Sequence, residues 1–414
     1  MTKSIYGLLV FVCLAACQKS GEEKSAGVIN ETAKARIDST FKSMIDSAKI
    51  AGVSALIYEN DKEVYFNSFG FEDREAGKAF NRNTIVRIFS MTKPITGTAL
   101  MQLYEKGMFQ LDDPLSKYLP EFADMKVFVG NDAQGKPKYV PANRPITVRD
   151  ITRHTAGFAR AEHEQLGSMV KEADVMNLEN TLEQMAKKLS MLPLAFHPGE
   201  EWSYGICVDV QAYLVEKLSG KPFDQYVREN ILDPLGMKET NYVPVDTSRF
   251  AAVYVKNENG TLERMPDATA DLFNSKSWPL KPGGWGLTST VDDYQKFARM
   301  LVNNGSFNGV TILKAETLKL MTTNHLADSV TERMWLPSKG QVGFGIDFAV
   351  RVKPPADNNE KNGVVGEFFW DGAASTLFWV DPKNKLTAVL FVQVFPFSNE
   401  LHKDFRQAVY GKVN

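Results

Sequence analysis

The chain has 414 residues, which is enough for one large domain or two of ordinary size. Its 43% hydrophobic and 11% aromatic residues are typical of a globular protein with a core. The net charge of −2, with basic and acidic residues mixed, gives no sign of a basic stripe, so we expect no nucleic-acid partner.

The N-terminus has the pattern of an export signal. One lysine precedes an apolar run from Ile5 to Ala16, which is too short to span a bilayer. The ending Leu-Ala-Ala-Cys17 resembles the lipobox of bacterial lipoproteins, where cleavage precedes a cysteine that carries acyl chains. This resemblance implies a signal peptide at 1–16, a lipid anchor at Cys17 and a polar tether at 17–30, in a cell-envelope lipoprotein of the outer membrane facing the periplasm. The alternative is a plain signal peptide cut at the small residues.

Loss of residues 1–16 would leave two cysteines, Cys17 and Cys207. With Cys17 acylated, no internal disulfide is possible. Cys207 has no histidine close to it in sequence, so we interpret it as a small core residue rather than a nucleophile.

Two β-hairpins are expected, one near each end of the chain. Residues 54–70 read as two strands joined at Asn60-Asp61, and residues 375–393 repeat the pattern around Pro-Lys-Asn-Lys. The sequence between them is mostly helix and loop. The predicted fold class is therefore α+β, with one antiparallel sheet built from both chain ends and flanked by helices, the last of them within NELHKDFRQAVYG.

The main domain is expected to cover residues 31–414, with an inserted, mainly helical subdomain at roughly 110–270. Two stretches rich in Gly, Pro, Asn and Asp, at 123–145 and 244–284, read as long loops. Loops of that length are expected to shape a cleft or to form a lid.

The chain contains three Ser-x-x-Lys tetrads, which are Ser39/Lys42, Ser90/Lys93 and Ser168/Lys171. The second stands before PITGTALMQLYEKGM, whose apolar spacing predicts a helix from about Ser90 to a stop at Gly107. Ser90 and Lys93 should then share one face of its first turn, where Pro94 is tolerated. The helix N-terminus favours negative charge on the Ser90 oxygen, and burial favours a neutral Lys93 amine that can accept a proton. The alternative is a lysine that reaches solvent beside an N-cap serine.

Two later segments supply further candidates. Tyr204 stands just before a predicted helix that ends at Gly220, and beside a lysine it could act as a phenolate base. In FFWDGAASTLFWV, the amide of Ala373 could form an oxyanion hole with that of Ser90. Taken singly, Tyr204 also fits a packed aromatic residue, and the second segment also fits an ordinary strand entry.

Together these segments resemble the serine β-lactamase and penicillin-binding-protein superfamily, most of all its class C β-lactamase and family VIII esterase branch. The likeness runs from about residue 35 to 414 and includes RIFSMTKPITGTALMQLYEKGMFQLDDPLSKYLPEF, ITVRDITRHTAGF and GGWGLTSTVDDYQKFARMLVNNG. It implies a β-lactamase/transpeptidase-like fold. It also implies that Ser90 is the acylated nucleophile, Lys93 its proton acceptor and Tyr204 the tyrosine base.

Two positions depart from the family pattern. Tyr-x-Asn is Tyr204-Gly205-Ile206 here, so the asparagine that binds an amide side chain is missing. Trp370-Asp371-Gly372 stands in the place of Lys-Thr-Gly, whose lysine helps to hold the substrate carboxylate in β-lactam-binding members. An anion in place of a cation should penalise a carboxylate substrate. Neutral carboxylic esters are therefore favoured over β-lactams and peptidoglycan stems.

Other hydrolase classes fit less well. The nearest approach to Gly-x-Ser-x-Gly is GVSAL, which lacks the last glycine of the α/β-hydrolase motif. No His-Glu-x-x-His occurs among the five histidines, so no metal or other cofactor is expected. His154, in RHTAGF, is interpreted as a structural loop residue and is the spare candidate if a histidine takes part.

The sequence thus predicts a serine hydrolase that works through an acyl-enzyme on a small ester or amide substrate, with carboxylic esters preferred. A β-lactamase or D-Ala-D-Ala carboxypeptidase activity is the first alternative. A non-catalytic binding lipoprotein of the same fold is the second. The two altered motifs favour a non-catalytic protein, and the intact Ser90, Lys93 and Tyr204 argue against it.

Overall fold

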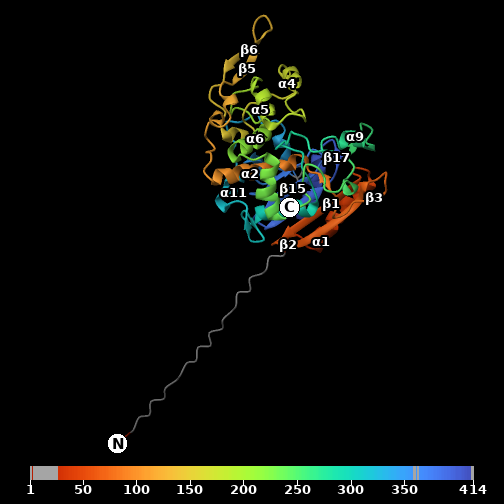
Figure 1. The fold of residues 1–414 in the computed structure, drawn as a ribbon. Helices are drawn as coiled ribbons and strands as arrows, with labels where there is room; N and C mark the ends of the chain where they lie inside the picture. Colours follow the sequence, from red (N-terminus) through yellow and green to blue (C-terminus); the bar gives the residue numbers. More distant parts are fainter. Residues whose placement is uncertain (1, 3–26, 358–359, 361–362, 412–414) are drawn as a thin grey trace.

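The computed structural model describes residue 2, residues 27–357, residue 360 and residues 363–411 (Figure 1). The predicted signal peptide, Cys17 and most of the predicted tether lie outside these residues. None of the helices within the described residues combines the length and the apolar character needed to cross a lipid bilayer.

One antiparallel sheet of eight strands forms the centre of the molecule, in the order β12-β13-β14-β15-β16-β1-β2-β3. Pairing of β1 with β16 places Ser54 opposite Phe391, which joins the two ends of the chain as predicted. The strands of this sheet are β1 (Gly52–Glu59), β2 (Lys62–Asp73), β3 (Lys78–Ala79), β12 (Val342–Phe344), β13 (Ala349–Arg351), β14 (Phe368–Asp371), β15 (Leu377–Asp381) and β16 (Leu386–Phe391).

Both predicted hairpins are present in this sheet. The β1–β2 turn is made by Asn60 and Asp61, which both have positive φ angles, of 51° and 60°. Those angles suit a two-residue turn whose twist matches the strands, and Asn and Asp tolerate them. Every residue of β16 and nearly all of β1 are buried, because helices cover both faces of the sheet.

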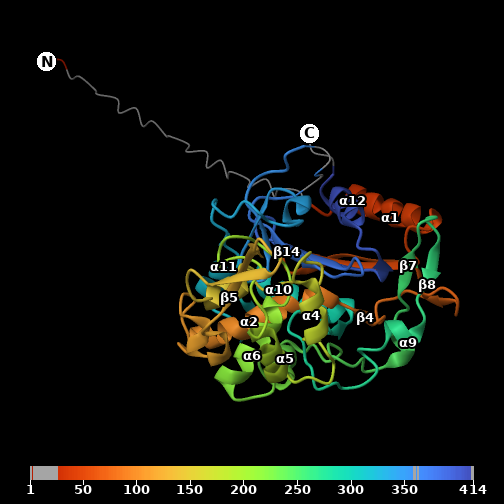
Figure 2. The same ribbon diagram turned by 90° about the horizontal axis from the view of Figure 1, so that it is seen from above.

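The helices form one layer on each side of the sheet. Figure 2 shows α1 and α12 together on one face, and α10, α2 and α6 on the other. In α12, the predicted final helix, Phe405 packs its ring 5.2 Å from that of Trp379 on β15. The helices are α1 (Glu31–Asp46), α2 (Thr92–Glu105), α3 (Val148–Thr152), α4 (Gly167–Ala173), α5 (Leu182–Ser190), α6 (Cys207–Ser219), α7 (Phe223–Val227), α8 (Asp233–Leu235), α9 (Asp267–Ala270), α10 (Val291–Val302), α11 (Ala315–Met321) and α12 (Asn399–Tyr410).

The region 110–270, predicted as a mainly helical insertion, holds α3 to α9 together with four short strands. The stretch 123–145, predicted as a loop, contains a hairpin that projects from the molecule (Figure 1). The stretch 244–284 contains β7, β8 and α9. The remaining strands are short and are β4 (Val86–Arg87), β5 (Lys126–Asn131), β6 (Pro137–Pro141), β7 (Tyr254–Lys256), β8 (Leu262–Arg264), β9 (Thr288–Ser289), β10 (Ser306–Phe307), β11 (Val310–Thr311) and β17 (Val394–Phe395).

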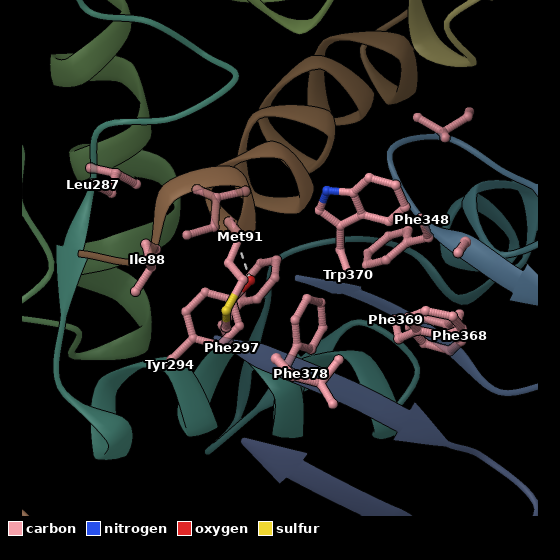
Figure 3. Packing of buried hydrophobic residues seen from close by; sticks show 14 of the residues in the cluster. Ile88, Met91, Leu287, Tyr294, Phe297, Phe348, Phe368, Phe369, Trp370 and Phe378 are labelled. Carbon is pink, nitrogen blue, oxygen red and sulfur yellow. Dashed lines mark hydrogen bonds between the residues drawn. The ribbon is translucent and has the colours of Figure 1, made fainter. Parts of the chain in front are cut away.

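Helix α2 lies at the centre, between the sheet and the inserted helices. Each of its residues from Thr92 to Met101 is buried, so it is enclosed on all sides rather than along one stripe. Figure 3 shows the packing below its first turn, where Met91, Tyr294 of α10 and Phe378 of β15 come together. The start of α2 is therefore held by the main core of the protein.

Candidate active site

Ser90 lies on a tight turn that leads directly into α2. The turn is a 3₁₀ helix, η1 (Phe89–Met91), and α2 begins at the next residue. Phe89 has a φ of 45°, a conformation that a non-glycine residue keeps only where the surroundings hold it. Its ring packs edge-on against Phe395, with the centroids 5.5 Å apart, and the Tyr294 hydroxyl donates to the Met91 carbonyl at 2.7 Å (Figure 3). The half-buried Ser90 is thus carried on a rigid backbone.

Lys93 is buried against Ser90. Only 4% of Lys93 is exposed, and its Nζ lies 3.2 Å from Ser90 Oγ. The same Nζ donates a hydrogen bond of 2.6 Å to the carbonyl of Gly284. Because the amine is enclosed by protein groups, the alternative of a solvated lysine beside an N-cap serine does not hold.

The contacts of the Lys93 amine suit a proton acceptor. A neutral amine has two N–H groups and one lone pair. The Gly284 carbonyl takes one N–H, and the face of the Tyr204 ring, whose centroid is 4.5 Å from Nζ, can take the other. In the structure Nζ donates to Ser90 Oγ, and a neutral form of the amine would instead turn its lone pair to that hydroxyl. This arrangement allows Ser90 to donate its proton to Lys93.

Tyr204 joins the site through its ring. Its hydroxyl accepts a hydrogen bond of 3.2 Å from Trp370 Nε1. The ring contacts those of His154, at 4.8 Å, and Trp335, at 5.0 Å between centroids. The structure therefore brings Tyr204 beside Lys93, as the motif order predicts. The Tyr204 hydroxyl, however, is hydrogen-bonded to the indole of Trp370. Its role as a base stays a prediction.

Three buried titratable groups surround Lys93. Burial raises the pKa of Asp209 to about 6, with the positive charge of Lys93 acting against that rise. Burial also raises the pKa of Asp347 well above its usual value, opposed by a hydrogen bond from Gln211 and by Lys93. Burial, and then the charges of Lys93 and Arg160, lower the pKa of His154 well below its usual value.

His154 is therefore neutral at physiological pH and sits as a packed ring. It is fully buried, and neither ring nitrogen has a hydrogen-bond partner among the described residues. Its ring lies against Trp202 and Phe344, with centroids 5.9 and 5.4 Å away, as well as against Tyr204. These contacts agree with the interpretation of His154 as a structural residue.

The end of β14 comes against the backbone that leads to Ser90. A Cβ on Gly372 would lie 2.5 Å from the carbonyl oxygen of Ile88, so a glycine is needed for this approach. The Gly372 amide donates to Thr376 at 3.0 Å and closes a tight turn in which Ala373 is exposed. The segment predicted to supply the second oxyanion amide thus reaches the neighbourhood of Ser90.

Asp371 is not the free anion that the sequence suggests. It pairs with Lys339, the last residue of the 3₁₀ helix η6 (Leu336–Lys339), and both side chains are buried. The Lys339 ammonium also lies 5.3 Å from the Trp370 ring centroid and 4.7 Å from that of Phe397. The expectation that Asp371 adds negative charge to the cleft is therefore corrected, because Lys339 balances that charge. The same pairing occupies the cation, which leaves it unavailable to a substrate carboxylate.

Cys207 opens α6 as a free, buried cysteine, and burial raises the pKa of its thiol, in keeping with its interpretation as a core residue. Within the part of the chain that the structure describes, no cluster of three or more His, Cys, Asp or Glu is arranged to hold a metal ion.

Sequence reasoning missed several residues of the site. Asp209 had a usable signal, because it is an acidic residue inside CVDVQAYLV, a stretch that is otherwise apolar enough to be buried. Gly284 stands in a segment used only for the family resemblance. Lys339 and Trp335 belong to no motif, and only the folded chain brings them to Asp371 and Tyr204.

A serine with a buried lysine one helical turn later, beside an antiparallel sheet edged by helices, defines a serine hydrolase of the Ser-x-x-Lys type. The sequence profile described as Beta-lactamase matches residues 37–411. The chain belongs to the beta-lactamase family, and its α+β fold and serine hydrolase class follow the expectation from its motifs.

Relatives cover most of the chain. Protein Rv1367c of Mycobacterium tuberculosis is 32% identical over 383 residues, which are 90% of this chain and 92% of that protein. Esterase EstB of Burkholderia gladioli is 26% identical over 403 residues, 91% and 95% of the two chains. The solved structure of EstCE1, described as a hydrolase with promiscuous acyltransferase activity, aligns with a TM-score of 0.76 at 25% identity, over 92% of this chain and 99% of that one.

Proposed function

We propose that this protein hydrolyses neutral carboxylic esters through an acyl-enzyme formed on Ser90. The observation that carries the proposal is the contact of 3.2 Å between the buried Lys93 amine and the Ser90 hydroxyl. The similarity to an esterase, EstB, over nearly the whole chain supports the choice of esters.

The proposed reaction has two steps. Ser90 Oγ attacks the ester carbonyl carbon while its proton passes to Lys93 Nζ, and the amides of Ser90 and Ala373 stabilise the oxyanion. The alcohol then leaves with a proton delivered through Tyr204. A water molecule attacks the acyl-enzyme, its proton passes through the same basic groups to Ser90 Oγ, and the carboxylic acid and free Ser90 are released.

The charges beside the site support neutral substrates. Lys339, which contacts the Trp370-Asp371-Gly372 segment, is paired with Asp371 and buried beside the rings of Trp335 and Trp370. A substrate carboxylate placed there would lose its hydration without gaining a cation. Ile206, in place of the family asparagine, offers no amide to a peptide-like side chain.

A cavity beside the segment that follows Tyr204 supports a substrate with an apolar group, because its wall is mainly apolar, although Arg160, Glu162, Lys171 and Asp174 also stand in it. It has a volume of about 380 Å³ and lies between the loop at 158–162, helices α4 and α5, and the start of α6. That volume falls in the range of about 300–1,000 Å³ that is typical of small-molecule pockets. Gly205 and Ile206, which directly follow Tyr204, form part of its wall. The acyl or alcohol group of the ester is proposed to lie in this cavity.

The test compares p-nitrophenyl esters with acyl chains of two to eight carbons against a chromogenic cephalosporin. We expect kcat/KM for the best ester to exceed that for the cephalosporin by more than about 100-fold. A substrate carboxylate that finds no cation loses about 3 kcal/mol of binding free energy, which corresponds to that ratio of kcat/KM values. The Ser90→Ala variant serves as the blank for uncatalysed hydrolysis. Faster turnover of the cephalosporin than of every ester would overturn the proposed specificity.

We further propose that the protein is an exported lipoprotein anchored through acyl chains on Cys17, since each buried methylene adds about 0.8 kcal/mol of membrane affinity. Mass spectrometry of the mature N-terminal peptide from the native host tests this directly. The expected peptide begins at Cys17 and carries the mass of its acyl groups. An unmodified Cys17 in the mature protein would contradict the anchor.

A further inference from the structure

We propose that Asp209 is a positioning residue of this site, which fixes the Gly284 peptide so that the Gly284 carbonyl holds the Lys93 amine against Ser90. The inference rests on the proposed function in one respect, because it concerns the activation of Ser90. It assigns a role to a residue that no motif singled out.

Three consecutive hydrogen-bond contacts connect Asp209 with Ser90. Asp209 Oδ1 accepts from the Gly284 amide at 3.0 Å. The carbonyl of the same residue accepts from Lys93 Nζ at 2.6 Å, and that Nζ lies 3.2 Å from Ser90 Oγ. Asp209 and Lys93 are each 4% exposed, so water does not compete strongly for these groups. A shift of the Gly284 peptide would therefore shift the amine.

The Gly283-Gly284 peptide is packed between α2 and α6. Thr96 of α2 donates to the Gly283 carbonyl at 2.7 Å. A Cβ on Gly283 would lie 2.5 Å from the carbonyl oxygen of Val208 in α6. A Cβ on Gly284 would lie 3.1 Å from Asp209 Oδ2 and 3.2 Å from Lys93 Nζ. The two glycines thus allow this loop to enter between a carboxylate and an amine, each of which it contacts.

The burial of Asp209 is costly, which points to a role in activity rather than in stability. Removal of a carboxylate from water is unfavourable, and burial raises the pKa of Asp209 to about 6. The titratable groups that face it are Lys93 of α2, Tyr242, and Cys207 of its own helix. Of these, only Lys93 can carry a positive charge, when it is protonated.

The sign of the stability effect follows from that raised pKa. The unfolded chain ionises Asp209 at a lower pH than the folded protein does. The stability associated with this carboxyl group is therefore fully present at low pH and is lost as the pH rises through about 6. An asparagine at this position cannot ionise, so the stability of Asp209→Asn relative to the wild type should increase as the pH rises from 3.8 to about 6 and stay constant above that.

The kinetic test uses Asp209→Ala and Asp209→Asn in the full-length protein. The probe is a fluorophosphonate, whose fluoride leaves when Ser90 Oγ bonds to phosphorus, so labelling needs serine activation but no particular ester. We expect Asp209→Ala to lower the labelling rate and the kcat for an aryl ester by roughly 10- to 100-fold, with KM changed by less than about twofold, as for a small misplacement of a catalytic group. Asp209→Asn should lose less, because its amide oxygen can still accept from Gly284.

The matched control is Asp293→Asn. Asp293 is also a buried aspartate that accepts from a backbone amide, at 2.7 Å from Glu239, but it lies at the start of α10. Its replacement should leave the labelling rate of Ser90 unchanged. The methyl group of Gly284→Ala would press against both Asp209 and Lys93, so this variant alone should lower the labelling rate. Combined with Asp209→Asn, it should lower the rate little further, because both changes disturb the same contacts.

Slower labelling of Asp209→Ala with partial recovery in Asp209→Asn, together with the relative gain of stability of Asp209→Asn as the pH rises to about 6, supports the inference. Wild-type labelling rates in Asp209→Ala would overturn it. If that variant fails to fold, wild-type rates in both Asp209→Asn and Gly284→Ala would overturn it instead. A wild-type protein that is labelled at Ser90 but hydrolyses no ester would contradict the proposed function and leave the Asp209 inference standing.

Discussion

Replacement of Ser90 by alanine is expected to lower kcat/KM for aryl esters by roughly 10⁴-fold or more, since losing a nucleophile removes the covalent path. The residual rate would come from substrate binding and the oxyanion amides alone. The side chain is half-buried on η1, and its loss removes one hydroxyl without touching the core residue Met91. Initial rates at saturating and limiting ester concentrations measure the effect.

The control for this variant is Ser39→Ala. Ser39 belongs to another Ser-x-x-Lys tetrad of the chain, but it lies exposed on α1. Ser39→Ala tests whether a Ser-x-x-Lys spacing by itself contributes to ester hydrolysis. The rate of ester hydrolysis should stay within about twofold of wild type, as is usual for surface substitutions. Ester hydrolysis by Ser90→Ala at a rate within tenfold of wild type would show that another nucleophile is used.

Replacement of Lys93 by alanine is expected to lower kcat by roughly 10³-fold, within the range of about 10²–10⁴ that general-base catalysis contributes. The reason is that the Ser90 proton then has no acceptor at 3.2 Å. Lys93→Arg gives a sharper comparison. A guanidinium remains protonated, so arginine supplies a positive charge but cannot accept a proton. Both variants should therefore be similarly inactive if Lys93 acts as a base.

Lys42→Ala is the matched control, because Lys42 is the exposed lysine of the Ser39 tetrad, with its Nζ 5.6 Å from the Phe69 ring centroid. It should hydrolyse esters at the wild-type rate. Activity of Lys93→Arg close to that of wild type would mean that a positive charge at position 93 suffices, and that the proton of Ser90 goes elsewhere.

Local patterns were enough to predict the parts of the fold that depend on neighbouring residues. The Asn60-Asp61 turn fixes one hairpin, and the apolar spacing after Ser90 fixes α2. The two stretches interpreted as long loops contain short strands, which their content of Gly, Pro and Asn concealed. Short strands at the edge of a domain carry too few apolar residues to show a clear period.

The contacts of the candidate site are likewise of two kinds, those between near neighbours in sequence and those between distant parts of the chain. The Ser90–Lys93 contact spans one helical turn, so its spacing together with the apolar helix that follows could predict it. The Lys339–Asp371 pair and the Asp209–Gly284 hydrogen bond join distant parts of the chain. No local pattern encodes such contacts, and the balanced charge of Asp371 could be recognised only once both partners were placed. The charge balance of the Lys339–Asp371 pair is thus a product of the tertiary fold.

The most direct measurement is fluorophosphonate labelling of the full-length protein, with the adduct located by mass spectrometry of its peptides and the labelling rate compared between wild type and Lys93→Ala. We expect the adduct on the peptide that contains Ser90, formed in wild type and slowed by roughly 10³-fold in Lys93→Ala. An adduct on a different serine, or equal labelling rates in the two proteins, would contradict activation of Ser90 by the Lys93 amine.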